Sequence, residues 1–572
     1  MHKKWKLLPK IDKEIVSQFP DMNPVCLQLL FNRKINTQEK IDEFFNSDYL
    51  DDIHDPYLLK DMKVAVKRIY QAIKKQEEVL IYGDYDADGV TSSALLYDIL
   101  DKLGIRADVY IPHRETEGYG FNMNSVQEII EKKYTLVISC DCGVSNFDEI
   151  EVLTKAGIDV IITDHHKEPK KLPPALAIIH AGLSREKYPF DKLAGVGIAY
   201  KLACGLLKSN LCKLNESEKN KTAKWLLDLV ALGTVADMVS LVGENRTLVK
   251  YGLIVLKKTQ CLGLQQLYEI SGINLEKMSS YTIGFQIGPR LNAAGRIDHA
   301  NTAFELLTTK NLNRAIKISN ELNAKNRERQ DITKQLVSEA KEKVGVINEK
   351  QKMIWVQNKN WNLGIIGLVA GKLSNEFYRP SFVLGYDGEN WVCSSRGIEE
   401  LDLMEIINSV SDKLIRFGGH KSAAGFSISK KNIQEVKDNI EKYINKKLKN
   451  IQLSPTIHLD AEISLADIDW DLWKHLDKFE PFGMNNKKPK FLIKNCQVKN
   501  IQFLGENRTH LKLEVGQDSV VKKAIGFSMV KNFTDLKVGQ KIDLVAQVDV
   551  NEWNGTRNLE LYIVDLVVRR KK

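Results

Sequence analysis

The chain has 572 residues, a formal net charge of +9, 43% hydrophobic residues and 27% charged residues. This length predicts three or four domains and excludes a single small binding module. The composition is typical of a soluble globular protein and excludes a disordered or membrane-embedded chain. The mildly basic charge is compatible with a nucleic-acid partner, although a lysine-rich composition alone gives the same balance.

The sequence indicates neither a membrane nor an oxidising compartment. No run approaches the roughly 18 apolar residues that a transmembrane helix needs, and Met1–Glu14 becomes charged before a signal-peptide core could form. Eight cysteines without a CxxC pair predict reduced thiols rather than a disulfide framework or a zinc finger. We therefore expect a cytoplasmic protein that has no membrane partner.

The first half of the chain predicts a helical segment followed by an α/β domain. Apolar spacing in residues 1–60 favours short helices. From about Lys63, four short β-rich runs (79–83, 106–114, 135–143 and 158–166) alternate with helical stretches. Such alternation predicts an open, mostly parallel sheet with helices on both faces over residues 61–300. Ligands bind at the carboxyl ends of the strands in this architecture.

The second half predicts three further parts. Residues 313–343 have helical periodicity, heavy charge and neither proline nor glycine, so we predict a long connecting helix within 301–346. Residues 347–452 again alternate strands and helices and predict a second α/β domain. Residues 453–572 contain strand after strand, which suits a small barrel such as an OB-fold.

Acidic and histidine side chains follow three strands of the first predicted sheet and one apolar helix. They are Asp84, Asp86, Asp88, Asp141, Asp164, His165, His166 and Asp237. Turn chemistry would explain any one of these loops. It does not explain the set, because several carboxylates at one sheet edge repel each other by several kcal/mol unless cations neutralise them. Two divalent ions would supply that charge, and oxygen plus imidazole ligands favour Mn²⁺ or Mg²⁺.

At these residues the sequence resembles a known superfamily. The stretches GDYDADG, SCDCG, TDHH and TVADMV, in this order, are similar to the four motifs of the DHH phosphoesterases. The later stretches GPRLNAAGR, WNLGIIGLVAGKL, SSRG, GGHKSAAG and PFGMNNKKPKF are similar to those of the RecJ single-strand-specific exonucleases, including their DHH-associated and OB domains. The resemblance covers about residues 81–568.

The resemblance implies a role for each residue of the set. It implies two divalent ions held by Asp84, Asp86, Asp141, His165 and Asp237. Asp141 would bridge both ions, and His166 would face the scissile phosphate. We expect Asp164 to orient an imidazole and Asp88 to cap the loop before the helix at Val90. Cys140 and Cys142 flank Asp141 on an extended strand, so we expect them to point away from it and to pack.

Substrate-binding candidates come from the motifs that contain arginine. Arg114, Arg296 and Arg396 can hold phosphates bidentately, with Asn292, Ser394, Ser395 and His420 beside them. The alternatives are salt bridges for the arginines and a buried, satisfied histidine for His420. In the β-rich end, Phe503, Trp553, Arg508 and Arg557 give the aromatic and basic mixture by which OB-folds bind single strands. Use of the aromatic residues in the core is the alternative there.

The resemblance implies a metal-dependent 5′→3′ exonuclease that hydrolyses single-stranded DNA to mononucleotides in recombination and repair. It also implies a single-strand-binding protein and a repair helicase as partners, and we expect a monomer. A DHH-family phosphodiesterase for oligonucleotides or cyclic dinucleotides is the first alternative, although such a substrate needs no strand-tracking domain. A catalytically silent scaffold is the second, and the retained ligand set argues against it.

Overall fold

The computed structural model describes residues 3–553 and 555–569, which form two units. We call residues 1–53, 240–250 and 455–572 the barrel unit, and residues 54–239 and 251–454 the two-sheet unit. Within the described residues, no helix combines the length and the apolarity needed to span a bilayer.

The first sheet of the two-sheet unit is entirely parallel, with strand order β3-β2-β4-β5-β6. Its strands are β2 (Val79–Gly83), β3 (Ala107–Tyr110), β4 (Leu136–Cys140), β5 (Asp159–Thr163) and β6 (Ala177–Ile179). β2 lies between β3 and β4, so the chain reverses its direction across the sheet between β2 and β4. Open α/β sheets bind ligands at such a switch point, and the predicted parallel α/β fold is confirmed.

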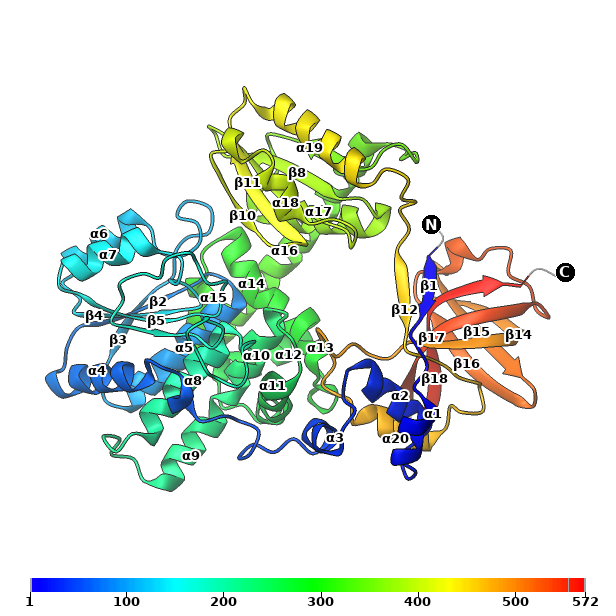
Figure 1. Ribbon diagram of the computed structural model, residues 1–572, viewed down its shortest axis with the longest axis horizontal. Helices are drawn as coiled ribbons and strands as arrows, with labels where there is room; N and C mark the ends of the chain where they lie inside the picture. Colours follow the sequence, from blue (N-terminus) through cyan, green and yellow to red (C-terminus); the bar gives the residue numbers. More distant parts are fainter. Residues whose placement is uncertain (1–2, 554, 570–572) are drawn as a thin grey trace. The chain divides into compact units, whose positions relative to one another are not determined.

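Helices cover both faces of this sheet (Figure 1). α6 (Met123–Glu131) and α7 (Phe147–Lys155) pack their apolar faces on one side, where Val126, Ile129 and Leu153 join the buried strand residues. α4 (Met62–Lys75), α5 (Ala87–Lys102) and α8 (Gly195–Lys208) lie on the other side. The strands are therefore buried on both faces, which explains their continuous apolar sequences.

A helical region links the first sheet to the second. It consists of α9 (Glu216–Trp225), α10 (Leu227–Ala236), α11 (Gly243–Leu256), α12 (Leu262–Ser271), α13 (Ser280–Thr282), a π-helical turn (Ile283–Ile287), α14 (Gly288–Ile297), α15 (Asn301–Thr308) and α16 (Leu312–Val344). The 33 residues of α16 confirm the predicted long helix. Its C-terminal part buries Leu336, Val337 and Ala340 in the core of the second sheet, so α16 joins both halves of the unit.

The second sheet is mixed, with strand order β10-β11-β9-β8-β7. It contains β7 (Ile354–Gln357), β8 (Ser381–Tyr386), β9 (Trp391–Arg396), β10 (Arg416–Gly419) and β11 (Ala423–Ile428). Only the β7–β8 pair is parallel. Three helices accompany it: α17 (Leu363–Phe377), α18 (Leu403–Asn408) and α19 (Ile433–Lys447).

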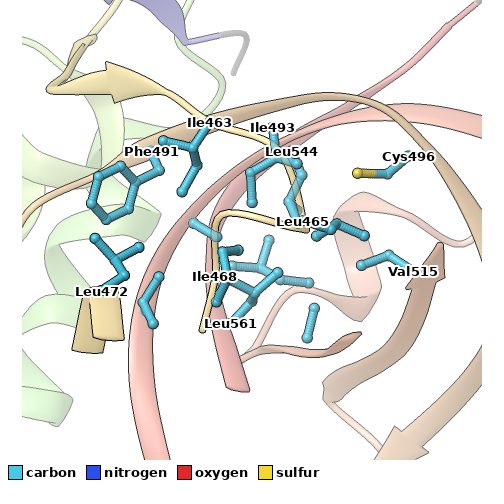
Figure 2. Close-up of a cluster of buried hydrophobic side chains, with 14 of the residues drawn as sticks. Ile463, Leu465, Ile468, Leu472, Phe491, Ile493, Cys496, Val515, Leu544 and Leu561 are labelled. Atoms are coloured by element: carbon cyan, nitrogen blue, oxygen red, sulfur yellow. The ribbon is translucent and has the colours of Figure 1, made fainter. Parts of the chain in front are cut away.

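The barrel unit closes on itself through five strands. These are β14 (Phe491–Leu504), β15 (His510–Gln517), β16 (Val520–Gly526), β17 (Lys541–Trp553) and β18 (Thr556–Val568), and β14 pairs with both β15 and β17. Figure 2 shows the apolar side chains that fill the interior, among them Phe491, Leu544 and Leu561. Closure removes free strand edges, and the predicted C-terminal barrel is confirmed.

The N-terminal segment forms part of the barrel unit. It contains the expected short helices α1 (Lys13–Gln18), α2 (Pro24–Asn32) and α3 (Gln38–Phe45), but also an unexpected strand, β1 (Lys4–Leu7), parallel to β12 (Thr456–Leu459). Apolar residues of α2 and α3 share one core with the barrel, β13 (Ala461–Glu462) and α20 (Trp470–Asp477). Pairing between residues so far apart leaves no local signal in the sequence, and the division into five segments stays a prediction.

Candidate active site

The loop after β2 is shaped by its glycines. Asp84 and Asp86 follow the strand, and Asp86 caps α5 by accepting hydrogen bonds from the backbone N–H groups of Asp88 (2.8 Å) and Gly89 (3.1 Å). A Cβ on Gly89 would lie 2.5 Å from the carbonyl oxygen of Asp84. Glycine therefore lets α5 begin directly against the buried Asp84 carboxylate.

Asp141 follows β4 in a left-handed backbone conformation, with φ of 61°. A non-glycine residue is strained there, and its backbone N–H is fixed by the carbonyl of Thr163 at 2.9 Å. A Cβ on Gly195, at the start of α8, would lie 2.5 Å from Asp141 Oδ1. α8 thus begins with glycine where the carboxylate must fit.

Asp88 does not cap the loop before Val90 as predicted, because Asp86 fills that place. Its two oxygens instead accept the backbone N–H groups of Gly195 and Val196, both at 2.8 Å. These are the first donors of α8, where a negative charge is favoured. Asp88 is buried, and its Oδ2 lies 3.9 Å from His165 Nε2. It therefore ties α8 to the site and also faces it.

The loop after β5 carries the DHH residues. Asp164 Oδ1 accepts the backbone N–H of His165 (2.7 Å) and Nδ1–H of His166 (2.8 Å), while Oδ2 accepts the backbone N–H of Val144 (2.9 Å). Burial opposes ionisation, but the hydrogen bond and charge of His166 hold the pKa of Asp164 well below its usual value. The imidazole that Asp164 orients is therefore that of His166.

The two histidines have opposite pKa shifts. Burial, and then the charge of His166, lower the pKa of His165 to about 3. Burial also disfavours the charged form of His166, but the hydrogen bond and charge of Asp164 outweigh it and raise the pKa of His166 to about 9. At neutral pH, His165 is thus neutral and has a lone pair free to bind a metal ion, and His166 is a cation.

Asp237, which ends α10, completes the set. His165 Nε2 lies 3.1 Å from Asp141 Oδ1 and 3.7 Å from Asp237 Oδ2. Three groups of residues each offer donor atoms that lie within 4.8 Å of one another. The groups are Asp84 with Asp86 and Asp141, Asp88 with His165 and Asp237, and Asp141 with His165 and His166. Asp141 and His165 each belong to two of the groups. The structure thus brings together all six predicted catalytic residues.

The described chain does not balance the charge of the carboxylates at this end of the first sheet, which we call the acidic edge (Asp84, Asp86, Asp88, Asp141 and Asp237). Burial, and then neighbouring carboxylates, raise the pKa of Asp84 to about 8, of Asp88 to about 7 and of Asp237 to about 9. The pKa of Asp141 is raised well above its usual value for the same reasons. Asp84 Oδ1, Asp141 Oδ1 and His165 Nε2 are buried without a hydrogen-bond partner among the described residues. Carboxylate and imidazole donors of this kind fit Mn²⁺ or Mg²⁺.

Three predicted arginines gather beside the acidic edge. The Arg114 guanidinium lies 4.8 Å from the centre of the Tyr85 ring, and Arg296 donates from Nη1 to the carbonyl of Gly364 at 3.1 Å. Burial lowers the pKa of Arg396, and the charge of Arg114 lowers it further. None of the three forms a salt bridge with a described residue. The salt-bridge alternative is therefore excluded for them within the described chain.

A glycine of α17 leaves room for the Arg396 side chain of β9. A Cβ on Gly367 would lie 2.9 Å from Ser394 Oγ and 3.6 Å from Arg396 Nη2. Ser395, by contrast, is buried and donates to the carbonyl of Ala424 at 2.8 Å. Ser394 therefore stands beside the guanidinium, and Ser395 holds β9 to β11.

The other substrate-binding candidates differ from one another. Asn292 Oδ1 accepts the backbone N–H of Ala87 at 2.9 Å, so this amide holds the aspartate loop. His420 is exposed in the turn between β10 and β11, which excludes the buried-histidine alternative. Its charge is among the smaller causes of the lowered pKa of His165.

Sequence reasoning missed Tyr119. Its hydroxyl lies 2.9 Å from His166 Nδ1 and 3.2 Å from the carbonyl of Asp141. Because Nδ1 gives its proton to Asp164, the tyrosine proton goes to Asp141, and the strained residue gains a second backbone anchor. The residue lies in the stretch IPHRETEGYG, but only the arginine of that stretch signalled a function.

Cys140 and Cys142 pack as predicted. Both are buried, with Cys140 Sγ 3.3 Å from Ser93 Oγ and Cys142 Sγ 3.7 Å from the carbonyl of Tyr82. All eight cysteines are free thiols.

In the barrel unit, Phe503 is 41% exposed on β14, which excludes the core alternative. Arg557 lies over the Trp470 ring at 5.7 Å, and the side chain of Trp553 lies outside the described residues. Sequence reasoning missed a group of neighbouring rings, in which His510 of β15 and Tyr562 of β18 lie 5.4 and 5.9 Å from Phe527 in the turn after β16.

Comparison with known proteins finds matches along most of the chain. Three family models match in order: the DHH family, N-terminal domain (residues 78–234), the DHHA1 domain (350–446) and the RecJ OB domain (459–565). The single-stranded-DNA-specific exonuclease RecJ of Bacillus subtilis is 36% identical over 549 residues, which is 96% of this chain and 68% of the relative. The chain belongs to the RecJ family. The RecJ of Haemophilus influenzae is 31% identical and matches 95% of this chain and 96% of its own.

Solved RecJ structures share the fold. The crystal structure of RecJ in complex with Mn²⁺ from Thermus thermophilus matches with a TM-score of 0.83 and 26% identity, over 100% of this chain and 80% of that one. An exonuclease RecJ bound to manganese matches with a TM-score of 0.60 and 30% identity, over 69% of this chain and 98% of that one. Both relatives bind manganese, one of the two metals that the donor set fits.

Proposed function

We propose that this protein is a metal-dependent exonuclease that hydrolyses single-stranded DNA from the 5′ end to mononucleotides, in recombination and repair. One observation carries the proposal: buried carboxylates whose charge the described chain does not balance stand beside arginines that form no salt bridge with a described residue. A phosphodiester together with divalent ions would neutralise both sets. Membership of the RecJ family, whose curated members are named single-stranded-DNA-specific exonucleases, supports DNA as the polymer.

The metal ligands we assign are Asp84, Asp86, Asp141, His165 and Asp237, with Asp141 shared between two ions. When bound, two divalent ions supply positive charge to the phosphoryl oxygens and acidify an attacking water. Asp88 adds charge to this edge while holding α8. The strained backbone of Asp141 keeps its carboxylate directed at both donor groups.

His166 is the residue we assign to the phosphate. Its Nδ1–H is committed to Asp164 at 2.8 Å, which leaves Nε2–H for a phosphoryl oxygen. With a pKa raised to about 9 by Asp164 against the effect of burial, it carries a positive charge at neutral pH. Hydrogen bonds from a charged donor to an oxyanion are the strong ones.

End recognition is the role we propose for Arg114, Arg296 and Arg396, with Ser394 and His420. A terminal 5′-phosphate carries more negative charge than an internal diester, and guanidinium groups bind it bidentately. Asn292 acts on the substrate through the aspartate loop that it holds. Direction of cleavage follows, because the metal ligands alone do not distinguish the two ends of a strand.

We place the enzyme in the cytoplasm as a monomer, with a single-strand-binding protein and a repair helicase as partners. Eight free thiols support a reducing compartment. A phosphodiesterase for cyclic dinucleotides or short oligonucleotides is the alternative activity. The exposed rings of the barrel unit favour the longer substrate, because a small one would leave them unused.

The decisive experiment follows 5′-labelled and 3′-labelled single strands with the full-length protein in Mn²⁺, Mg²⁺ or chelator. We expect immediate release of labelled mononucleotide from the 5′ label, gradual shortening of the 3′-labelled strand, and no reaction in chelator. Blunt duplex and circular single strands serve as controls and should resist. Mononucleotides appearing first from the 3′ label, or cleavage of the circle, would refute the proposal.

A further inference from the structure

Two exposed aromatic rings stand on the helix that borders the acidic edge. Tyr281 of α13 and Phe285 of the following π-helical turn stack at 4.5 Å between centroids with 24° between planes. They are 63% and 68% exposed. Ile283 and Ile287 of the same turn are fully buried, so the rings occupy the outer side of this segment. Turns of π-helix are rare and occur frequently at functional sites.

The position of this ring pair along the acidic edge follows from packing. A Cβ on Gly288 would lie 3.5 Å from the Cβ of Ala236, the residue before Asp237. At the other end of α14, a Cβ on Gly295 would lie 2.7 Å from the carbonyl of Tyr85, between Asp84 and Asp86. α14 and its π-helical turn therefore run along the acidic edge, with the end of the turn beside the residue before Asp237 and Arg296 near Asp86.

Arginines without a carboxylate partner among the described residues lie along α14 and the neighbouring α16. Arg290 donates to the carbonyl of Gln286 at 2.6 Å and to Asn323 Oδ1 at 3.1 Å. Burial lowers its pKa, and the charges of Arg327 and Arg329 lower it further. Arg329 acts in the same way on Arg296. None of these four arginines forms a salt bridge with a described residue, so the charge is available to a polyanion.

We propose that Tyr281 and Phe285 form a stacking platform for nucleobases of the strand being degraded, on the 3′ side of the cut. The inference rests on the proposed function, which places the 5′ end at Arg114, Arg296 and Arg396. A strand that starts there and crosses the acidic edge continues along α14 towards the ring pair. From Arg296 to Phe285 the helix rises about 16 Å, which corresponds to about three to five nucleotides. Aromatic stacking is independent of base identity, as a degrading enzyme requires.

The test combines a protein variant with a DNA lesion. Tyr281→Ala/Phe285→Ala should lower kcat/KM on a 5′-phosphorylated strand of about 20 nucleotides about tenfold. In the wild type, one abasic residue at nucleotide three, four or five should lower kcat/KM by a similar factor. In the alanine variant, the same abasic residue should lower kcat/KM no further. Tyr281→Phe/Phe285→Tyr should restore the wild-type values. Ile254→Ala removes a side chain of similar exposure from α11 and should change nothing.

Three outcomes would overturn the platform. The first is an unchanged kcat/KM in the alanine variant, and the second is that the losses from the variant and from the lesion multiply fully. The third is a sedimentation mass of the alanine variant that is half that of the wild type, which would make the rings an interface between two copies of the chain. Anisotropy with a fluorescein-labelled oligothymidylate of the same length repeats the comparison as binding. It tests the platform even if the wild type cuts no DNA, an outcome that would refute the proposed function alone.

Discussion

The acidic edge and the neighbouring arginines are two charged regions of opposite sign. The described chain neutralises the charge of neither region. The buried Arg68, by contrast, is paired within the chain: it lies 2.7 Å from Glu77 and 2.5 Å from Asp159. At the acidic edge, buried oxygens have no hydrogen-bond partner among the described residues, and along α14 and β9 the guanidinium groups have no carboxylate there. Burying unpaired charge destabilises a fold. Both regions are therefore where we propose that ligands bind, cations at one and phosphates at the other.

The largest effect should come from Asp141, the carboxylate that two donor groups share. We expect Asp141→Ala to reduce hydrolysis in Mn²⁺ by about three orders of magnitude or more, because loss of the shared carboxylate displaces both ions. Wild-type protein should melt at a higher temperature when Mn²⁺ is added, and the variant should lose most of that shift. Binding of a single strand should remain.

Asp228→Asn is the matched control, since Asp228 is also buried but lies outside the acidic edge and keeps two hydrogen-bond partners. It should retain both the activity and the Mn²⁺ shift. More than a few per cent of wild-type activity in Asp141→Ala would contradict the two-ion assignment.

The second effect tests the positive region. Arg396→Ala should reduce kcat/KM on 5′-phosphorylated strands by about tenfold to a hundredfold and on 5′-hydroxyl strands far less, because a charge-assisted bidentate contact is lost. Arg296→Ala should show the same preference plus a loss on both substrates, since its guanidinium also holds Gly364. The measurement is the ratio of kcat/KM for the two ends.

Arg396→Lys separates charge from geometry and should restore only part of the ratio. Arg185→Ala, a substitution in a paired arginine of the same unit, should leave the ratio unchanged. Equal losses on both ends in Arg396→Ala would make this arginine a general backbone contact.

A smaller effect should come from the barrel unit. Removing residues 453–572, the simplest deletion that the sequence suggests, would expose the apolar faces of α2 and α3, which share the barrel core. Phe503→Ala/Phe527→Ala avoids this problem, because both rings are exposed. We expect about fivefold to tenfold weaker binding of long single strands by anisotropy, and unchanged cleavage of short oligomers.

Val521→Ala, a change at another exposed apolar residue of the barrel, should leave the affinity unaltered. The salt dependence of binding should also stay constant in the aromatic variant, since no phosphate contact is removed. Cleavage of short oligomers that falls in parallel with long-strand binding would place these rings in the catalytic step instead.

The sequence predicts the parts of this molecule whose signals are local. Strand and helix periodicity were sufficient for the parallel sheet, α16 and the barrel, and the loops after β2, β4 and β5 located the acidic edge. The missing parts depend on partners distant in the sequence. Asp88 binds the start of α8, far along the chain, and Tyr119 reaches Asp141 from an irregular loop. The neighbouring rings of the barrel come from β15, from β18 and from the turn after β16. No pattern within a window of the sequence encodes such pairings.

The smallest expected effect comes from Asp228. It is a buried carboxylate like those of the acidic edge, but the chain itself supplies its hydrogen-bond partners. Burial raises its pKa to about 6, although Thr259 and the backbone of Leu229 act in the opposite direction. A folded-state pKa above the unfolded value means that the folded chain holds the proton more tightly. Its contribution to stability is therefore complete below about pH 4 and is lost as the pH rises towards 6. The loss amounts to about 2 to 3 kcal/mol.

Relative to the wild type, Asp228→Asn should gain this stability between about pH 4 and 7, measured as the difference in melting temperature of the two-sheet unit. Adding Mn²⁺ should not alter that difference. A pH-independent difference would mean that Asp228 stays ionised in the fold, and a difference that Mn²⁺ abolishes would connect it to the acidic edge.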